Sequence, residues 1–314
     1  MAAVNKEVWA YLGLSVSTII IGLSFIITKI ALESSNPLDL LAHRFTAAAV
    51  AIIFPLAFGF IKLPKMTWRK VFKLLSFSVF YPLLFFGFQT FGLQYSSASE
   101  GGIIFATTPV ITLIAASFFL KEKTNIIEKI GIILSVFGIF YILYGKGLNV
   151  DFSNIAGIVL LLLSVLSLVA YFVLVRKANA EFDALVITLF MTFLAFIAFN
   201  TFSLLSHFQN GTISDFLTPL SEPSFVWSVL YLGILSTVVT SFFSNYALSV
   251  IPASTVSIFG NLSPIIAVIG GVLILNETLY FYHIVGGLLV LSGIAVSIAF
   301  KSKQKEKIKC QVNI

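Results

Sequence analysis

Ten long apolar segments, separated by short polar connections, limit the fold of this chain more than any other feature of its sequence. A helix needs about 20 apolar residues to cross the hydrocarbon core of a bilayer. Only 10% of the residues are charged and 59% are hydrophobic, whereas a soluble domain carries about 25% charged residues. The sequence therefore predicts an all-α integral membrane protein with ten transmembrane helices. We place these helices near residues 10–32, 38–60, 73–95, 99–120, 128–145, 155–175, 184–205, 225–248, 254–275 and 283–300.

The distribution of Lys and Arg predicts how these helices are oriented. With ten spans, the basic clusters at 62–73, 121–129, 176–177 and 301–309 fall on the side of the N-terminus, and Lys146 alone falls on the other. Cytoplasmic loops of membrane proteins carry an excess of Lys and Arg. We therefore expect a multi-pass protein of the cell membrane with both termini in the cytoplasm. The basic tail either contacts anionic lipids or serves as a solvated topology signal.

An internal repeat divides the chain into two halves. Residues 92–145 align with 247–300 at a constant offset of 155, without a gap. Five spans in each half is an odd number, so the second copy enters the membrane from the opposite side. We expect two inverted five-helix repeats, at 1–150 and 151–300, followed by a basic cytoplasmic tail at 301–314. Inverted repeats of this kind are typical of secondary transporters. The most specific matched pairs are Pro109 with Pro264, Glu122 with Glu277, Gly131 with Gly286, and Gly138 with Gly293.

Several short motifs give the chain a family resemblance. It resembles the drug/metabolite transporter superfamily, in the ten-helix branch built from two EamA-like domains. The resemblance implies an exporter of amino acids or other small metabolites. Two departures are Ile21, where the family often has Trp, and the absence of counterparts to Lys29 and Arg44 in the second half. The motifs are Gly22-x-Ser24-Phe25, Lys29, Pro37, Arg44-Phe45, Tyr95-Ser96-Ser97-Ala98-Ser99-Glu100, Pro109, Glu122 and Gly131, and then Pro252-Ala253-Ser254, Pro264, Glu277, Gly286 and Gly293.

Two prolines interrupt corresponding apolar helices of the two halves. Pro109 and Pro264 each remove a helical hydrogen bond and free the carbonyl four residues earlier, at Phe105 and Gly260. Non-helical backbone at membrane depth is tolerated where it lines a cavity or is buried in protein. The pair therefore predicts either a substrate cavity beside the helix breaks or kinks that serve packing alone.

Polar and aromatic residues near these breaks are the candidate substrate-binding residues. We expect the helices at 73–95, 99–120, 225–248 and 254–275 to meet in mid-membrane around one cavity. The alternative is that the small polar residues of 225–248 hold membrane helices together. The candidates are the amides Gln89, Asn245 and Asn261, the carbonyls of Phe105 and Gly260, and the rings of Tyr81 and Phe105.

Charged residues inside predicted spans form a second candidate group. Lys29, Arg44 and Glu100 all lie towards the outer ends of their helices. Ionisable groups within a membrane are costly and are usually paired or face a cavity. Two interpretations remain open, a structural ion-pair cluster and a site for a substrate carboxylate. Glu122 and Glu277 follow helix ends, where we expect each to cap the next helix.

The motifs of other function classes are absent from the sequence. It has no GxxxxGK[ST] run for ATP, no HExxH and no GxSxG. We therefore expect no enzyme activity, no cofactor and no metal site, with a small-molecule substrate and membrane lipids as partners and no nucleic acid. Oligomeric state stays open. The predicted function is gradient-driven export of small metabolites, such as amino acids or hydrophobic compounds, by alternating access, with Glu100 as the first candidate should protons drive transport. The alternative is a non-transporting membrane protein, either a receptor scaffold or a lipid-modifying enzyme.

Overall fold

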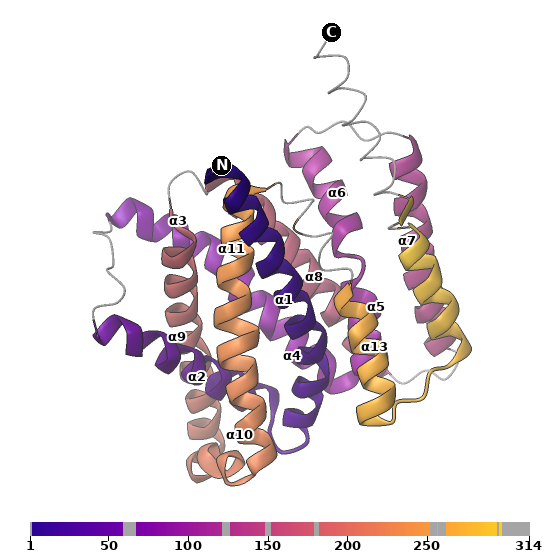
Figure 1. Cartoon of the computed structure of the whole chain (residues 1–314). Coiled ribbons are helices and arrows are strands. Elements are labelled where there is room, and N and C mark those ends of the chain that lie inside the picture. The colour runs from indigo at the N-terminus through magenta and orange to yellow at the C-terminus, as the bar shows by residue number, and fades with distance from the viewer. Residues whose placement is uncertain are drawn as a thin grey trace.

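The computed structural model describes residues 2–58, 67–120, 126–147, 152–178, 182–251, 256, 262–293 and 295–296. All regular secondary structure in these ranges is helical (Figure 1). The elements are α1 (Ala2–Leu32), α2 (Pro37–Ala57), α3 (Trp68–Ser78), η1 (Val79–Leu84), α4 (Phe85–Tyr95), α5 (Ala98–Phe105), α6 (Thr108–Leu120), α7 (Ile126–Gly147), α8 (Phe152–Ala178), α9 (Ala184–Asn210), η2 (Ile213–Ser221), α10 (Pro223–Leu230), η3 (Tyr231–Val239), α11 (Thr240–Val250) and α13 (Leu262–Leu275), with a further apolar helix at Phe281–Gly293.

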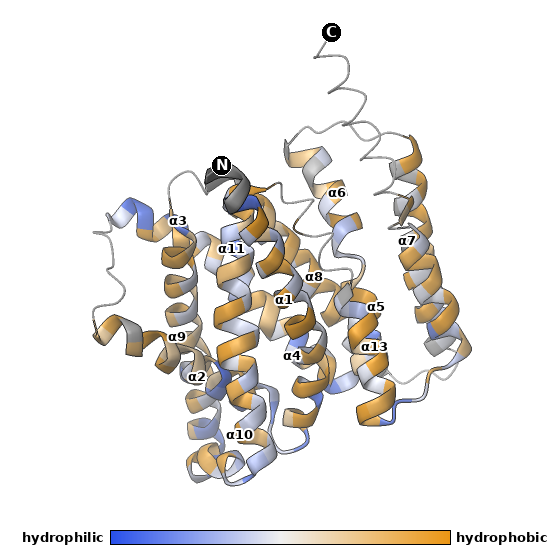
Figure 2. Ribbon diagram, in the orientation of Figure 1, coloured by the Kyte–Doolittle hydropathy of each residue, from blue (hydrophilic) through white to orange (hydrophobic). Residues whose placement is uncertain are grey.

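The apolar helices identify a multi-pass membrane protein. Seven described stretches are long and apolar enough to cross a bilayer, and hydrophobic residues predominate along them (Figure 2). The predicted spans at 128–145, 254–275 and 283–300 are not among these seven, so the number ten stays a prediction. The seven stretches are Lys6–Leu32, Pro37–Phe54, Trp68–Tyr95, Ala98–Phe119, Ile155–Val175, Ala184–Asn210 and Pro223–Val250.

Local sequence signals explain where several helices begin and end. Asn36 caps α2 by accepting a hydrogen bond from the Asp39 backbone N–H, and Pro37 occupies the first turn, where no helical donor is lost. Ser97 and Glu100 form a capping box at the start of α5. The left-handed conformation of Gly211 ends α9, at φ 68°, which glycine adopts without steric cost.

The internal repeat is visible in two membrane-spanning stretches of equal length. Trp68–Tyr95 and Pro223–Val250 each have 28 residues, and both limits differ by the same offset of 155. Each contains a π-helical segment, η1 in one and η3 in the other, and each is followed by an extended residue, Ser96 or Ile251. The two stretches run in opposite directions (Figure 1), as inverted repeats require.

A break divides the apolar stretch Ala98–Phe119 into α5 and α6. The turn at Ala106 and Thr107 separates the two helices, and Pro109 is the second residue of α6. Proline is tolerated in the first turn of a helix because its missing N–H would have no partner there. The predicted interruption is therefore a helix restart, two residues before the proline itself.

Glycines set the closest helix crossings. A Cβ added to Gly138 of α7 would lie 2.6 Å from the carbonyl oxygen of Gly286, and one added to Gly286 would lie 2.8 Å from that of Gly138. Close backbone approach through small residues is typical of membrane helix pairs. Gly102 of α5 makes a similar approach to α13, because its Cβ would lie 3.1 Å from the Pro264 carbonyl oxygen.

Candidate functional site

A central cavity of about 80 Å³ lies where the two 28-residue stretches meet α1, α5, α6 and α8. Of the residues proposed from sequence, Tyr81, Gln89, Phe105, Asn245 and Pro109 line it. Gly260 and Asn261 lie outside the described residues. The prediction did not include α1 and α8, which contribute Ser17, Ser24, Tyr171 and Phe172 among others. The structure thus brings together residues from both halves of the chain around one cavity.

Aromatic rings form one wall of this cavity. Tyr81 stacks on Tyr171 with ring centroids 4.8 Å apart and packs against Phe85 and Phe86 at 5.2 and 5.3 Å. Phe105 extends the wall, 6.3 Å from Phe85. Tyr81 itself has non-helical backbone angles, φ −139° and ψ 120°, within η1. The interruption of the helix therefore lies at the aromatic wall.

Hydroxyl groups form the facing wall at repeat-related positions. At the offset of 155, the cavity-lining residues of the first stretch pair with cavity-lining residues of the second. The bulky member is always in the first half and the small hydroxyl always in the second. The pairs are Tyr81 with Ser236, Phe85 with Thr240, Phe86 with Ser241, and Gln89 with Ser244. The repeat places these residues at corresponding positions. The first half has large side chains there, and the second half has serine or threonine.

Asn245 takes part in a network between helices. Its Nδ2 donates to Thr188 Oγ1 at 2.9 Å, and its Oδ1 accepts from the hydroxyl of Tyr171. The hydroxyls of Tyr81 and Ser241 form a similar bond at 2.8 Å. These contacts join α11 to α8, α9 and η1. The Asn245 side chain therefore lines the cavity and also holds neighbouring helices together. The sequence had left these two roles as alternatives.

The two prolines lie in different surroundings. Beside Pro109, the carbonyl of Phe105 accepts a hydrogen bond from Thr108 Oγ1 at 2.6 Å, so the acceptor that Pro109 leaves is satisfied across the break between α5 and α6. Pro264 does not line the central cavity. It lies in an apolar cavity of about 280 Å³ between α5, α13 and the helix Phe281–Gly293, together with Ile103, Ile265 and Leu288. The two breaks therefore do not contribute equally to the central cavity.

The three charged residues proposed from sequence have separate described partners. Lys29 Nζ donates to the carbonyl of Leu93 at 2.9 Å. Arg44, only 1% exposed, donates from Nε to Thr237 Oγ1 at 2.9 Å and from Nη2 to Ser236 Oγ at 3.2 Å. Its guanidinium carbon lies 4.0 Å from the ring centroid of Phe86. Among the described residues, the contacts of Arg44 are thus with η3 and the cavity wall, and Glu100 is not one of them.

Glu100 lies in a second network, at the start of α5. Its carboxylate accepts from the Ser97 backbone N–H at 2.9 Å and lies 3.3 Å from His283 Nε2. Glu277, from the second half, accepts hydrogen bonds from the backbone N–H groups of Ala98 and Ser99. The sequence predicted that Glu277 caps the next helix. It caps α5 of the other half instead, because folding brings that helix N-terminus to the end of α13.

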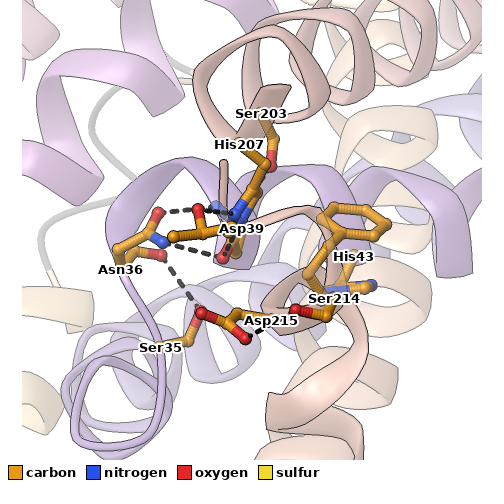
Figure 3. A network of polar contacts seen from close by, with 10 residues as sticks. Ser35, Asn36, Asp39, His43, Ser203, His207, Ser214 and Asp215 are labelled. Carbon is orange, nitrogen blue, oxygen red and sulfur yellow. Dashed lines mark hydrogen bonds and ion pairs between the residues drawn. The ribbon is translucent and has the colours of Figure 1, made fainter. Parts of the chain in front are cut away.

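A buried cluster around Asp39 was not found from sequence (Figure 3). Asp39 Oδ2 accepts from Asn36 Nδ2 at 2.7 Å and lies 2.9 Å from His207 Nε2, and Ser203 donates to Oδ1. The other ring nitrogen of His207 lies 2.8 Å from Thr212 Oγ1. The cluster fastens the start of α2 to the end of α9. Asp39 follows a capping Asn by three residues, and capping was the only signal that the sequence offered.

No candidate metal site lies in the described ranges, and His43 makes contacts with a neighbouring segment. These ranges contain no group of three His, Cys, Asp or Glu side chains that could hold a metal ion. His43 Nε2 lies 2.8 Å from the Phe216 carbonyl, and its ring stacks on that of Phe216 at 4.6 Å. His43 therefore joins α2 to η2 at the end of the helix bundle.

Comparisons with known proteins agree with the repeat and the fold. The model of the EamA-like transporter family matches residues 8–144 and again 155–299. The chain is 42% identical over 293 residues to the uncharacterized transporter YcxC of Bacillus subtilis, covering 93% of this chain and 94% of that one. It is 25% identical over 281 residues to the chloroplastic WAT1-related protein At3g02690 of Arabidopsis thaliana, covering 87% and 65%. One solved crystal structure is similar in fold, with a TM-score of 0.60 at 16% identity over 94% of this chain and 96% of that one.

Proposed function

Because the chain belongs to the EamA-like transporter family, we propose that it is a secondary transporter that exports small metabolites by alternating access. The substrate enters the central cavity between the repeats from one side of the membrane. A conformational change of one repeat against the other then opens the cavity to the opposite side. In this proposal the candidate substrate-binding residues are Tyr81, Gln89, Phe105, Asn245 and the two residues outside the described ranges, Gly260 and Asn261.

The observation that carries the proposal is the origin of the cavity wall. Repeat-related residues of Trp68–Tyr95 and Pro223–Val250 line the same cavity, and both stretches change to π-helical geometry beside it. Transporters with inverted repeats bind substrate at the repeat interface near the membrane midplane, typically where helices are interrupted. Local π-helical turns are also frequent at functional sites. These features favour a transport site over a cavity left by imperfect packing.

The proposal includes a topology. It has ten spans, five in each of the repeats 1–150 and 151–300, with both termini and the 301–314 tail in the cytoplasm of a cell-membrane protein. The segment 206–224, which contains η2, then lies outside the cell. Accessibility labelling of single cysteines in Cys310→Ser protein tests this: residues 2 and 314 should be labelled only from the cytoplasm, and Ser214 only from outside. Labelling of the two termini from opposite faces would contradict the topology.

The proposed driving force is the substrate's own gradient. The sequence has no nucleotide motif, and Glu100 is held in a helix cap beside His283. A carboxylate in this position caps the helix N-terminus, and this contact gives Glu100 a structural role. An imposed pH gradient should therefore leave net flux unchanged at equal substrate on both sides. Uphill accumulation that is lost in Glu100→Gln would contradict a purely gradient-driven mechanism.

Efflux from preloaded proteoliposomes tests the transport function. The panel contains amino acids, nucleosides, hydrophobic amines and organic acids, each at the same internal concentration. Ser241→Trp should fill the cavity and abolish flux of the transported class. Ser249→Trp is the matched control, because Ser249 is exposed on the same helix and away from the cavity. Absence of flux for every class, with folded protein, would contradict the proposal.

A further inference from the structure

The polar groups of the central cavity differ in whether they already have partners. Three lining hydroxyls donate within their own helical stretches, those of Thr18, Ser24 and Thr240, and that of Thr108 donates across the break between α6 and α5 to the Phe105 carbonyl. Tyr81, Ser241 and Asn245 are joined to one another or to neighbouring helices. The hydrogen bonds of these seven groups are made to other parts of the protein. They leave only a few lining groups for a ligand.

The remaining polar groups define where a ligand would make hydrogen bonds. Ser17 is 1% exposed and its hydroxyl has no hydrogen-bond partner within the described ranges, and the Gln89 amide, 5% exposed, also lines the cavity. Ser236 Oγ accepts from Arg44, so its own O–H is left to donate. Buried polar groups without partners are costly, and a ligand that pairs with them removes that cost. The cavity therefore offers hydroxyl and amide donors to its occupant.

The charged group that contacts the described wall of this cavity is positive. None of the described lining residues is charged, but Arg44 contacts two of them, Ser236 and Phe86. The described contacts of this buried guanidinium are two hydroxyls and a ring, with no carboxylate among them. A buried charge requires compensation by an opposite charge or by hydrogen bonds. An anion in the cavity would supply that charge, whereas an ammonium group would find no carboxylate on the described wall.

We propose, building on the proposed transport function, that the substrate is a small organic monoanion with an apolar or aromatic body. Its carboxylate accepts a hydrogen bond from Ser236, whose hydroxyl Arg44 polarises, and its body packs against the ring wall of Tyr81, Phe85 and Phe86. Gln89 and Ser17 bind the remaining polar atoms. Arg44 does not line the cavity itself, and it determines the specificity for negatively charged substrates through its hydrogen bond to Ser236. The cavity excludes cations and disfavours zwitterions for the same reason.

A charge series on one ring tests this proposal. Benzoate, benzamide and benzamidine have nearly the same shape and carry charges of −1, 0 and +1 at neutral pH. Binding to the purified full-length protein in nanodiscs is measured by calorimetry, and transport by efflux from proteoliposomes. We expect benzoate to bind at least tenfold more tightly than benzamide, and benzamidine not to bind. Equal binding of all three, or tightest binding of benzamidine, would overturn the proposal.

Variants separate the role of Arg44 from a general charge effect. Arg44→Met should abolish the preference for benzoate over benzamide, and Arg44→Lys should keep part of it. Lys70→Met removes the same charge from an exposed site on α3 and should leave the preference unchanged. Should Arg44→Met fail to fold, Ser236→Ala tests the same contact, and its preference should fall at least threefold. An unchanged preference in folded Arg44→Met and Ser236→Ala would contradict the assigned role.

The two readouts distinguish this proposal from the transport function. Selective binding of benzoate with no flux of any compound would contradict transport and leave the anion site in place. Flux of neutral or cationic compounds without a preference for benzoate would contradict the anion site and leave transport in place.

Discussion

Replacing Glu277 with Gln should destabilise the protein through a helix cap that joins its two halves. The Glu277 carboxylate accepts from the Ala98 N–H at 2.6 Å, the Ser99 N–H at 3.0 Å and Ser99 Oγ at 2.6 Å. Both oxygens are used, and all three donors belong to the first turn of α5. Glutamine keeps the size of the side chain but replaces one acceptor oxygen with an NH2 group that cannot accept. At least one donor of α5 then loses its partner.

The expected magnitude follows from these contacts. A hydrogen bond to a charged group contributes about 1.5–3 kcal/mol. The charge at the helix N-terminus contributes about 0.3–1 kcal/mol more. Because the amide still forms part of the network, we expect Glu277→Gln to lower the free energy of unfolding by about 2–3 kcal/mol. Ser99→Ala removes one of the same bonds to the charged carboxylate and should cost about 1.5–3 kcal/mol.

Unfolding in mixed micelles by titration with SDS measures this change. Glu222→Gln is the matched control, because Glu222 is an exposed carboxylate at the start of α10 without a side-chain capping bond. Its effect should stay within about 0.5 kcal/mol. The double variant Glu277→Gln/Ser99→Ala should cost less than the sum of the single variants, since they share a contact. Wild-type stability of Glu277→Gln, or full additivity, would refute the inter-repeat cap.

Three further predictions concern other buried contacts, each measured by the same unfolding titration. Asn245→Leu should cost about 1–3 kcal/mol, because it removes the acceptor of the buried Tyr171 hydroxyl and the donor to Thr188 Oγ1; an unchanged unfolding midpoint would contradict this. Asp39→Asn should cost about 3 kcal/mol by leaving His207 and Ser203 without an anion, and the exposed Asp215→Asn serves as its control. Gly138→Leu should cost more than about 2 kcal/mol, because a Cβ there lies 2.6 Å from the Gly286 carbonyl oxygen; tolerance of Leu would refute the close crossing.

Much of the fold follows from local patterns that the sequence displays directly. Apolar length identifies seven of the predicted spans, and the offset of 155 relates both limits of Trp68–Tyr95 to those of Pro223–Val250. Their amide side chains near the helix breaks led to Gln89 and Asn245 as cavity candidates, and both line the central cavity. Apolar segments of membrane helices are easy to recognise because the bilayer fixes their length and their composition.

Contacts between distant residues could not be predicted in this way. Asp39 and His207 are separated by 168 positions, and each has an adequate local explanation at a helix end. Glu277 and Ala98 are 179 positions apart, and a carboxylate after a helix fits capping of the next helix equally well. In these cases the local signal identifies the kind of interaction, and only the packing of helices identifies the partner.

The asymmetry of the cavity side chains has a physical reason if the protein transports a molecule with two unlike ends. The repeat relates Trp68–Tyr95 to Pro223–Val250, so that the two stretches present corresponding positions to the cavity. Identical side chains at those positions would offer both ends of a substrate the same environment. The chain instead places Tyr81, Phe85, Phe86 and Gln89 opposite serine and threonine hydroxyls. In the proposed mechanism the two related stretches exchange the open side of the cavity, while the substrate keeps one orientation relative to the ring wall and Ser236.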